Sequence, residues 1–164
     1  ESMMGNECIG VSAPETDLES YAEKEDFKLY MGDTGLLISQ MIRYDNEDKN
    51  EIYRKILFGK SGINYGMAME NAVAQALRSN GHQLYFHRYE YAEKKYEIDF
   101  LTIRKQKICP IEVKSSDYRT HKSFDNLRKK YSGIKIQEQF VIYTKDIQRV
   151  GDVIYVPVYM AMLL

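Results

Sequence analysis

Acidic and basic side chains recur at strand spacing in two neighbouring segments of this sequence. In the first segment, Glu97 and Asp99 are acidic residues separated by one position. In the second segment, one residue separates Glu112 from Lys114. Residues two apart in a strand point to the same face of the sheet. Carboxylate oxygens are the ligands that Mg²⁺ prefers. The residue types and their spacing therefore allow a divalent metal ion to be held beside an ammonium group.

The two segments predict a hairpin whose register brings the acidic groups together. If the two residues after Arg104 form the loop, Arg104 pairs with Lys107, and the same register sets Asp99 opposite Glu112 with Cβ atoms about 5 Å apart. Two like charges at this distance destabilise the fold unless a raised pKa, a neighbouring cation or a bound metal compensates. The Lys-Gln loop is not of the Asn-Gly type that fixes such a turn. An ordinary charged sheet face with cross-strand ion pairs is the alternative.

A further acidic side chain, Glu70, lies in a segment with helical periodicity. The pattern predicts a helix from Tyr65 to Asn80, ending before Gly81, with Asn64 as a plausible N-cap. Residues three, four and seven apart share a helix face, so Glu70 lies on the side of Met67, Val73, Ala74 and Leu77. That placement directs Glu70 toward the core side, although an exposed helix Glu is the alternative.

The elements that must position these residues follow in a recognisable order. Residues 1–26 are polar and acidic and predict an arm or linker. Residues 27–61 predict a small helical region, with helices near Thr34–Ile42 and Asp48–Phe58. Residues 62–164 predict an α/β core, in which the helix with Glu70 is followed by strands and one more helix: strands at Gln83–Tyr91, Tyr96–Arg104 and Lys107–Ser115, a helix at Ser123–Tyr131, and strands at Glu138–Thr144 and Val153–Tyr159.

Composition indicates a folded domain. The chain has 164 residues, 44% of them hydrophobic, with only three Pro and ten Gly, which excludes collagen-like and disordered classes. Its two cysteines form no CxxC pair, which argues against a disulfide framework or a zinc ribbon and favours a reducing, cytoplasmic location. The longest apolar run, 153–164, is shorter than the roughly 20 residues of a membrane span, so no membrane partner is expected. The start at Glu1, without a signal peptide, suggests a piece of a longer protein.

Charge is distributed unevenly along the chain. Residues 1–86 carry 8 basic and 14 acidic side chains, whereas residues 87–135 carry 13 basic and 7 acidic ones. A basic segment of this kind indicates contact with a polyanion such as nucleic acid, although solvated surface charge is the alternative. The candidate phosphate contacts are Arg119, Lys122, Arg128, Lys129 and Lys130, of which the last three can also be the solvated end of a helix.

The ordered combination of these motifs resembles a known superfamily. A helical Glu, then Glu97-Ile98-Asp99-Phe100, then Ile111-Glu112-Val113-Lys114-Ser115 is similar to the restriction-endonuclease-like, PD-(D/E)XK superfamily. More narrowly, these motifs together with Phe27-Lys28-Leu29-Tyr30 and Asp33-Thr34-Gly35-Leu36-Leu37 resemble the C-terminal domain of prokaryotic AAA+ family ATPases. The resemblance covers most of the chain from about Phe27 onward.

The resemblance implies a fold and a function. The expected fold is a restriction-endonuclease-like α/β core, a mixed central sheet flanked by helices, with a small N-terminal helical region. The expected activity is Mg²⁺-dependent hydrolysis of DNA phosphodiesters, with Mn²⁺ as the alternative ion. Asp99 and Glu112 would be the metal ligands, Lys114 the water-positioning cation and Glu70 the helical contributor.

The same resemblance implies partners and leaves one alternative open. The expected partners are nucleic acid and an ATPase domain of the same full-length protein, and ATP would bind only to that module, which is absent from these residues. Many members of the narrower family have no established nuclease activity. A catalytically inactive module that binds nucleic acid or protein is therefore the alternative function.

Overall fold

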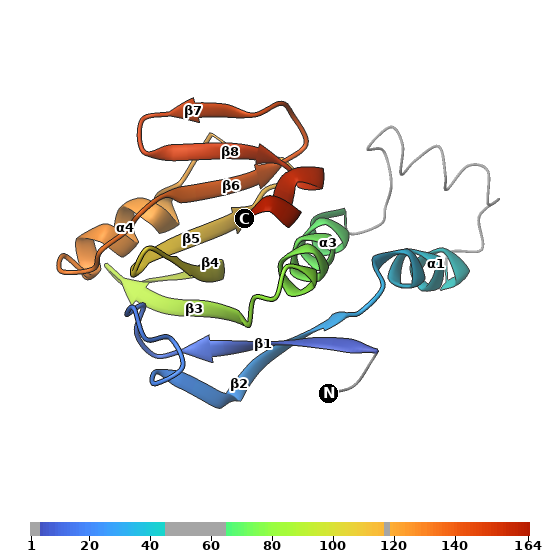
Figure 1. The fold of residues 1–164 in the computed structure, drawn as a ribbon, viewed down its shortest axis with the longest axis horizontal. Helices are drawn as coiled ribbons and strands as arrows, with labels where there is room; N and C mark the ends of the chain where they lie inside the picture. The colour runs from blue at the N-terminus through green and yellow to red at the C-terminus, as the bar shows by residue number, and fades with distance from the viewer. Residues whose placement is uncertain (1–3, 45–64, 117–118) are drawn as a thin grey trace.

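The computed structural model describes residues 4–44, 65–116 and 119–164 of the chain, which form a mixed α/β fold built on one eight-stranded sheet (Figure 1). The spatial order of the strands is β2-β1-β3-β4-β5-β6-β8-β7. The pairs β1/β3, β5/β6 and β6/β8 are parallel, and the other four pairs are antiparallel. The elements are β1 (Gly5–Val11), β2 (Ala22–Met31), α1 (Thr34–Tyr44), α3 (Tyr65–Ser79), β3 (Leu84–Tyr91), β4 (Lys94–Arg104), β5 (Lys107–Val113), α4 (Lys122–Lys130), β6 (Gln139–Tyr143), β7 (Gln148–Val150), β8 (Val153–Pro157) and a C-terminal 3-10 helix (Val158–Leu163).

Two hydrophobic cores fill the two faces of the sheet. The α3-side core joins Val73, Ala74 and Leu77 of α3 to sheet residues that include Phe86, Phe100 and Ile111. The α4-side core joins Phe124 and Leu127 of α4 to sheet residues that include Ile98, Leu101 and Ile108. Helices therefore cover both faces, as the sequence predicts. None of the helices in the described ranges is long and apolar enough to cross a membrane.

The position of α3 is fixed at both ends. At its C-terminus Gly81 adopts φ +88°, a conformation that other residues rarely take. Its N–H bonds to the Arg78 carbonyl at 3.0 Å and the next N–H bonds to the Leu77 carbonyl at 3.1 Å, which is a Schellman motif. Toward the N-terminus, the buried Asn71 side chain pairs with both main-chain groups of Met31 in β2, at 2.8 and 3.1 Å. These bonds hold the first turns of α3 against β2.

The β4–β5 hairpin has the register predicted from its sequence. Arg104 lies opposite Lys107, and the ladder continues to Phe100 opposite Ile111. The ladder ends at this pair, one step before Asp99 and Glu112. The predicted register is thus confirmed from Arg104/Lys107 to Phe100/Ile111, even though the loop is Lys105-Gln106 and both of these residues take positive φ, 50° and 58°.

This loop gives a direct test of the turn. Changing the pair to Lys105→Asn with Gln106→Gly is expected to raise the free energy of unfolding by about 1 to 2 kcal/mol, because left-handed backbone is unfavourable for residues with long side chains. Thermal unfolding followed by circular dichroism measures the effect. The control Lys105→Ala keeps a Cβ atom in the loop and should stay within about 0.5 kcal/mol of wild type. An unchanged melting temperature in the double variant would contradict the assigned turn.

A bulge in β4 changes the faces of its residues. Tyr85 lies opposite Leu101 but His87 lies opposite Ile98, so β4 has one extra residue between these pairs. Phe100 consequently belongs to the α3-side core and Ile98 to the α4-side core. In a regular strand these two residues, two positions apart, are predicted to share a face, and the bulge places them on opposite faces instead. Bulges of this kind re-aim a side chain and are common beside functional sites.

The first 26 residues do not form the expected acidic arm. Gly5–Val11 and Ala22–Met31 pair antiparallel as β1 and β2, with Cys8 opposite Lys28, and β1 continues the sheet by parallel pairing with β3. The prediction was wrong because β2 is an edge strand rich in charge, which hides its alternation. The glycines at both ends of β1 similarly weaken its strand pattern.

The expected helical region, residues 27–61, is corrected at its start. Residues 27–31 complete β2, and the first helix begins at Thr34, as predicted. Asp33 caps this helix, because its Oδ1 accepts a hydrogen bond of 2.9 Å from the Leu36 N–H. The second expected helix, Asp48–Phe58, and the N-cap at Asn64 lie outside the described residues.

The later elements agree with the sequence prediction apart from two details at the C-terminal end. The last predicted strand stops at Pro157, where the 3-10 helix begins, and not at Tyr159. The edge strand β7 was not predicted. It is only three residues long and all three are exposed, so the sequence carries no alternation to reveal it.

Candidate functional site

Asp99 turns its carboxylate into the seam between β4 and β5. Its Oδ2 accepts a hydrogen bond of 2.7 Å from the main-chain N–H of Val113 in β5. The pKa of Asp99 is raised to about 7, chiefly by burial; the Val113 hydrogen bond and Lys28 oppose the rise, and the charges of Glu70 and Glu112 add to it. Because Val113 is the residue between Glu112 and Lys114, the Asp99 carboxylate lies directly beside the Glu-x-Lys segment.

Glu112 and Lys114 form an ion pair on the α4 face of the sheet. The Lys114 Nζ atom lies 3.0 Å from Glu112 Oε2, and the Glu112 side chain is only 2% exposed. Burial raises the pKa of Glu112, Lys114 opposes this rise, and Asp125 of α4 adds to it. Apart from this ion pair, neither buried carboxylate oxygen of Glu112 finds a hydrogen-bond donor in the described part of the chain. A buried carboxylate with so few partners is a natural ligand for a cation.

Glu70 lies at the opposite face, where β2 holds it. Its Oε1 atom accepts a hydrogen bond from the Tyr30 hydroxyl and lies 3.2 Å from the Lys28 ammonium nitrogen. The contact between α3 and β2 through Asn71, the next residue, brings Glu70 to this position. Its side chain is 28% exposed, so the expected orientation toward the protein interior is partly realised.

Lys28 continues into a network of ion pairs across three strands. Its Nζ lies 2.5 Å from Glu97 Oε1 in β4. Glu97 Oε2 accepts a 2.7 Å hydrogen bond from Arg88 Nε in β3, and Arg88 Nη1 lies 2.6 Å from Asp26 Oδ1 in β2. Burial raises the pKa of Glu97, but its bonds to Lys28 and Arg88 outweigh burial and lower it overall. The charges near Asp99 on the α3 face are therefore fixed by direct contacts.

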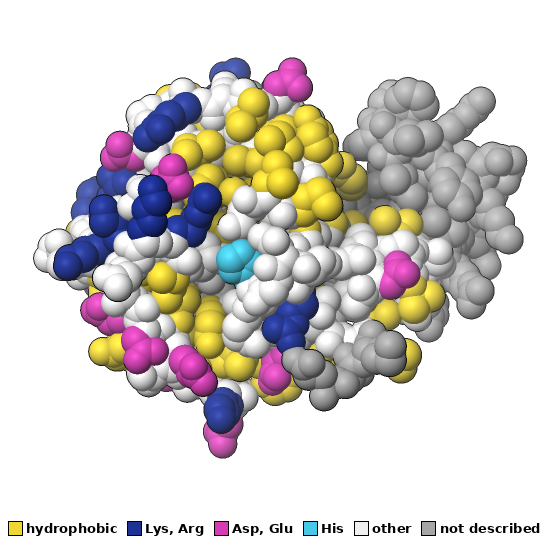
Figure 2. Space-filling view, viewed as in Figure 1, with side chains coloured by type: hydrophobic (Ala, Val, Ile, Leu, Met, Phe, Trp, Pro, Cys, Tyr) yellow, Lys and Arg dark blue, Asp and Glu magenta, His cyan; other side chains and the backbone are white. Residues whose placement is uncertain are grey.

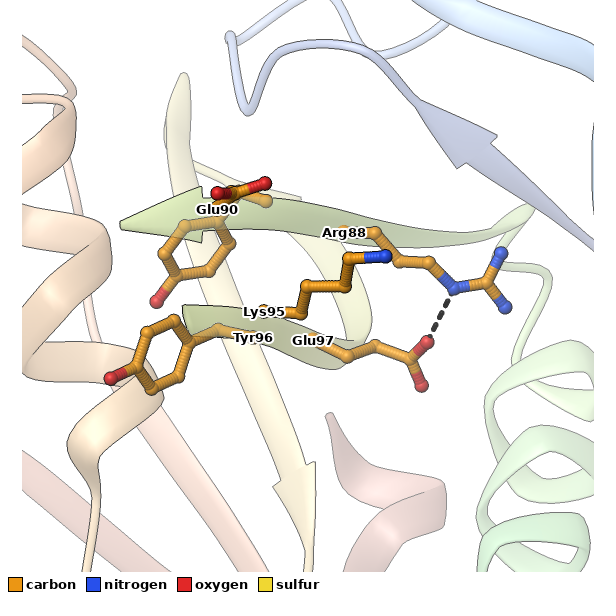
Figure 3. A pocket seen from close by; sticks show the side chains of 6 residues that line it. Arg88, Glu90, Lys95, Tyr96 and Glu97 are labelled. Atoms are coloured by element: carbon orange, nitrogen blue, oxygen red, sulfur yellow. Dashed lines mark hydrogen bonds and ion pairs between the residues drawn. The ribbon is translucent and has the colours of Figure 1, made fainter. Parts of the chain in front are cut away.

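The outer end of this network borders a pocket of about 530 Å³. Figure 3 shows the bond between Arg88 and Glu97 at one end of the lining residues and the Tyr96 ring at the other end. The pocket is lined by Arg88, Tyr89, Glu90, Lys95, Tyr96 and Glu97, at the β3–β4 hairpin. The sequence did not single out Lys28, Tyr30 or Arg88 as site residues. Reading residues 27–30 as an alternating strand, with Lys28 and Tyr30 on one face, was the signal that could have found two of them.

The five candidate phosphate contacts divide into two groups. Arg128 is engaged with Asp152 at 2.9 Å, and Lys130 donates to the Glu90 carbonyl at 3.1 Å. Arg119, Lys122 and Lys129 are exposed. In Figure 2, Lys and Arg side chains gather at the left, over the end of the molecule where Figure 1 places α4. The basic surface predicted from the sequence therefore exists, but at least two of its members have structural contacts.

The donor set limits what kind of metal site is available. Within the described ranges, no group of three or more His, Cys, Asp or Glu side chains is arranged to hold a metal ion. Mg²⁺ is commonly bound by only one or two carboxylates together with waters and substrate phosphates. The carboxylates of Asp99 and Glu112 are buried, and their oxygens suit a cation of this kind, although Asp99 accepts one main-chain hydrogen bond and Glu112 pairs with Lys114. Two carboxylates do not fit a closed structural zinc site.

Comparison with known proteins bears on the family of the chain. Residues 65–160, which include Glu70, Asp99, Glu112 and Lys114, match the family described as Domain of unknown function (DUF4143). Comparison with the curated proteins and with the solved structures found no match. Because the matched residues make up more than half of the chain, the protein belongs to the DUF4143 family.

Proposed function

We propose that this chain is a metal-dependent, nuclease-like domain of the PD-(D/E)XK type that hydrolyses phosphodiester bonds of DNA. One observation carries the proposal. The Asp99 carboxylate accepts a hydrogen bond from Val113, the residue that separates Glu112 from Lys114. The three side chains that the motif requires therefore belong to one small region of the β4–β5 hairpin. The orphaned oxygens of Glu112 and the burial of Asp99 support a cation at this position.

Each residue has a defined task in the proposed reaction. Asp99 and Glu112 would hold Mg²⁺, or Mn²⁺ in its place, which when bound polarises the scissile phosphate and lowers the pKa of its water. The Lys114 ammonium orients the attacking water and stabilises the negative charge that develops on the phosphate. Glu70, held by Lys28 and Tyr30, is the helical contributor and shapes the electrostatic field around Asp99.

The resemblance of the motifs also supports a wider context. We propose that the domain is the C-terminal part of a cytoplasmic AAA+ family ATPase, whose ATP is bound by a separate module. Nucleic acid and that ATPase domain are the proposed partners. The matched family region leaves Lys28 and Tyr30 outside it, so the N-terminal hairpin would join the domain to the rest of such a protein.

A second candidate function is a catalytically inactive module that binds nucleic acid or protein. One specific observation favours it: the carboxylates already have cationic partners within the protein, because Lys114 pairs with Glu112 and Lys28 pairs with Glu70. An inactive module would bind DNA with a salt-dependent affinity but would show no metal-dependent turnover.

Cleavage assays on single-stranded, duplex and branched DNA test the proposed function. With Mg²⁺ we expect cleavage that EDTA stops and that Asp99→Ala and Lys114→Ala each abolish. Lys107→Ala, which removes an exposed lysine from the same strand, is the matched control and should retain wild-type activity. Activity that survives both site substitutions would mean a contaminating nuclease and would contradict the proposal.

The basic surface gives a separate prediction for DNA binding. The double variant Lys122→Ala with Lys129→Ala is expected to weaken binding and to lower the slope of log affinity against log salt by about 2, since each phosphate contact contributes about 0.9. Fluorescence anisotropy between 50 and 200 mM salt, in EDTA, measures this slope. Lys24→Ala in β2 is the control for loss of a surface charge. An unchanged slope in the double variant would place the nucleic-acid contact elsewhere.

A further inference from the structure

The Lys28 ammonium sits in the position that a metal ion would take between two carboxylates. Its Nζ lies 3.2 Å from Glu70 Oε1 and 2.5 Å from Glu97 Oε1, and the Lys28 side chain is only 19% exposed. The three residues come from β2, α3 and β4, so the fold itself assembles this arrangement. The Lys28 Nζ atom lies over the Phe86 ring, 5.0 Å from its centroid. Packing against this ring fixes the direction in which the ammonium points.

The same ammonium acts on the candidate metal ligand. Lys28 and Asp99 influence each other electrostatically, and so do Glu70 and Asp99. Lys28 is therefore a cation on the α3 side of Asp99, whereas Glu112 and Lys114 lie on the α4 side. In hydrolases that use two metals, the ions lie about 3.5 to 4 Å apart and share carboxylate ligands. Here the Lys28 ammonium already pairs with Glu70, the carboxylate that would bind a second ion on the α3 side.

We propose that Lys28 is a positioning residue that replaces a second divalent cation, so that the candidate site holds a single metal ion. The proposal rests on the proposed function for the ion at Asp99 and Glu112. It also explains why the site needs the N-terminal hairpin: Lys28 and Tyr30 come from β2 and both hold Glu70. On this view Glu70 is a partner of Lys28 and not a metal ligand.

Counting bound Mn²⁺ tests the role of Lys28 without any activity measurement. The 164-residue chain is titrated with Mn²⁺, and free ion is measured by electron paramagnetic resonance, with folding checked by circular dichroism. We expect one ion per chain for the wild type and two for Lys28→Met, because the Oε1 atoms of Glu70 and Glu97 lose their ammonium partner and can hold the second. Lys28→Arg keeps the cation and should bind one ion. Lys24→Met, on the same strand, is the matched control and should also bind one.

The outcomes separate this inference from the proposed function. A wild type that binds one ion while Lys28→Met also binds only one would overturn the role of Lys28 and leave the proposed site intact. A wild type that binds none, with one ion gained in Lys28→Met, would support Lys28 and overturn the proposed site. Two ions in the wild type would contradict the inference directly.

A further variant covers the case in which Lys28→Met does not fold. Glu70→Gln keeps the shape of the side chain and is expected to leave the ion count of the wild type unchanged. Loss of an ion in Glu70→Gln would make Glu70 a metal ligand and would overturn the inference.

Discussion

Glu112→Gln is expected to weaken Mn²⁺ binding at least about 100-fold and to abolish Mg²⁺-dependent cleavage. Glu112 is buried, and its carboxylate has Lys114 as its ion-pair partner at 3.0 Å. The amide keeps the volume of the side chain but removes the negative charge that would bind the ion. Isothermal titration with Mn²⁺ measures the loss, and the cleavage assay measures its consequence.

The control for this substitution is Glu138→Gln. Glu138 pairs with Arg104 at 3.5 Å, so the change also neutralises one member of an ion pair, at the far end of the β4–β5 hairpin. We expect Glu138→Gln to bind Mn²⁺ as the wild type does. If Glu112→Gln also bound Mn²⁺ with wild-type affinity, Glu112 would not be a metal ligand.

Asp99→Asn is expected to stabilise the metal-free protein at pH 8 by on the order of 2 to 4 kcal/mol. Burial, with the charges of Glu70 and Glu112, raises the pKa of Asp99 from its ordinary value of 3.8 to about 7, against the opposing influence of Lys28. The folded state therefore retains this proton while the unfolded state releases it, so the wild type loses stability as pH rises from about 4 to about 7. Asn has no proton to release and can still accept the bond from Val113.

Urea unfolding in EDTA at several pH values measures this effect. The stability gain of Asp99→Asn should be near zero at pH 4, grow up to pH 7 and stay constant above it. Asp152→Asn is the matched control, because Asp152 is an exposed aspartate paired with Arg128, and its loss should give no gain at pH 8. If Asp99→Asn were less stable than the wild type at pH 8, the ionised Asp99 carboxylate would stabilise the folded state, which contradicts the prediction.

The hairpin that carries the candidate site was predictable from the sequence because its signals are local. Two residues between Arg104 and Lys107 fix the register, and the alternation of Ile111, Glu112 and Val113 fixes the faces of β5. The helix with Glu70 was equally clear, since its apolar residues recur at helical spacing and Gly81 ends it.

Other features depend on tertiary contacts that the sequence does not display. The bulge at Asp99 arises from the shift in pairing between β3 and β4, and no local pattern marks it. The sequence did not predict β2, because an edge strand exposes charged residues on both of its faces. The contacts of Lys28 and Tyr30 with Glu70 depend on β2 and were therefore not predicted either. Those contacts join residues about 40 positions apart in the sequence.

A crystal grown or soaked with Mn²⁺ provides the most direct measurement, because the anomalous signal locates the ion. We predict a single peak at the β4–β5 seam, with oxygens of Asp99 and Glu112 both among its ligands and the Lys114 ammonium beside it. A peak elsewhere, or an ion held by only one of these carboxylates, would contradict the shared site.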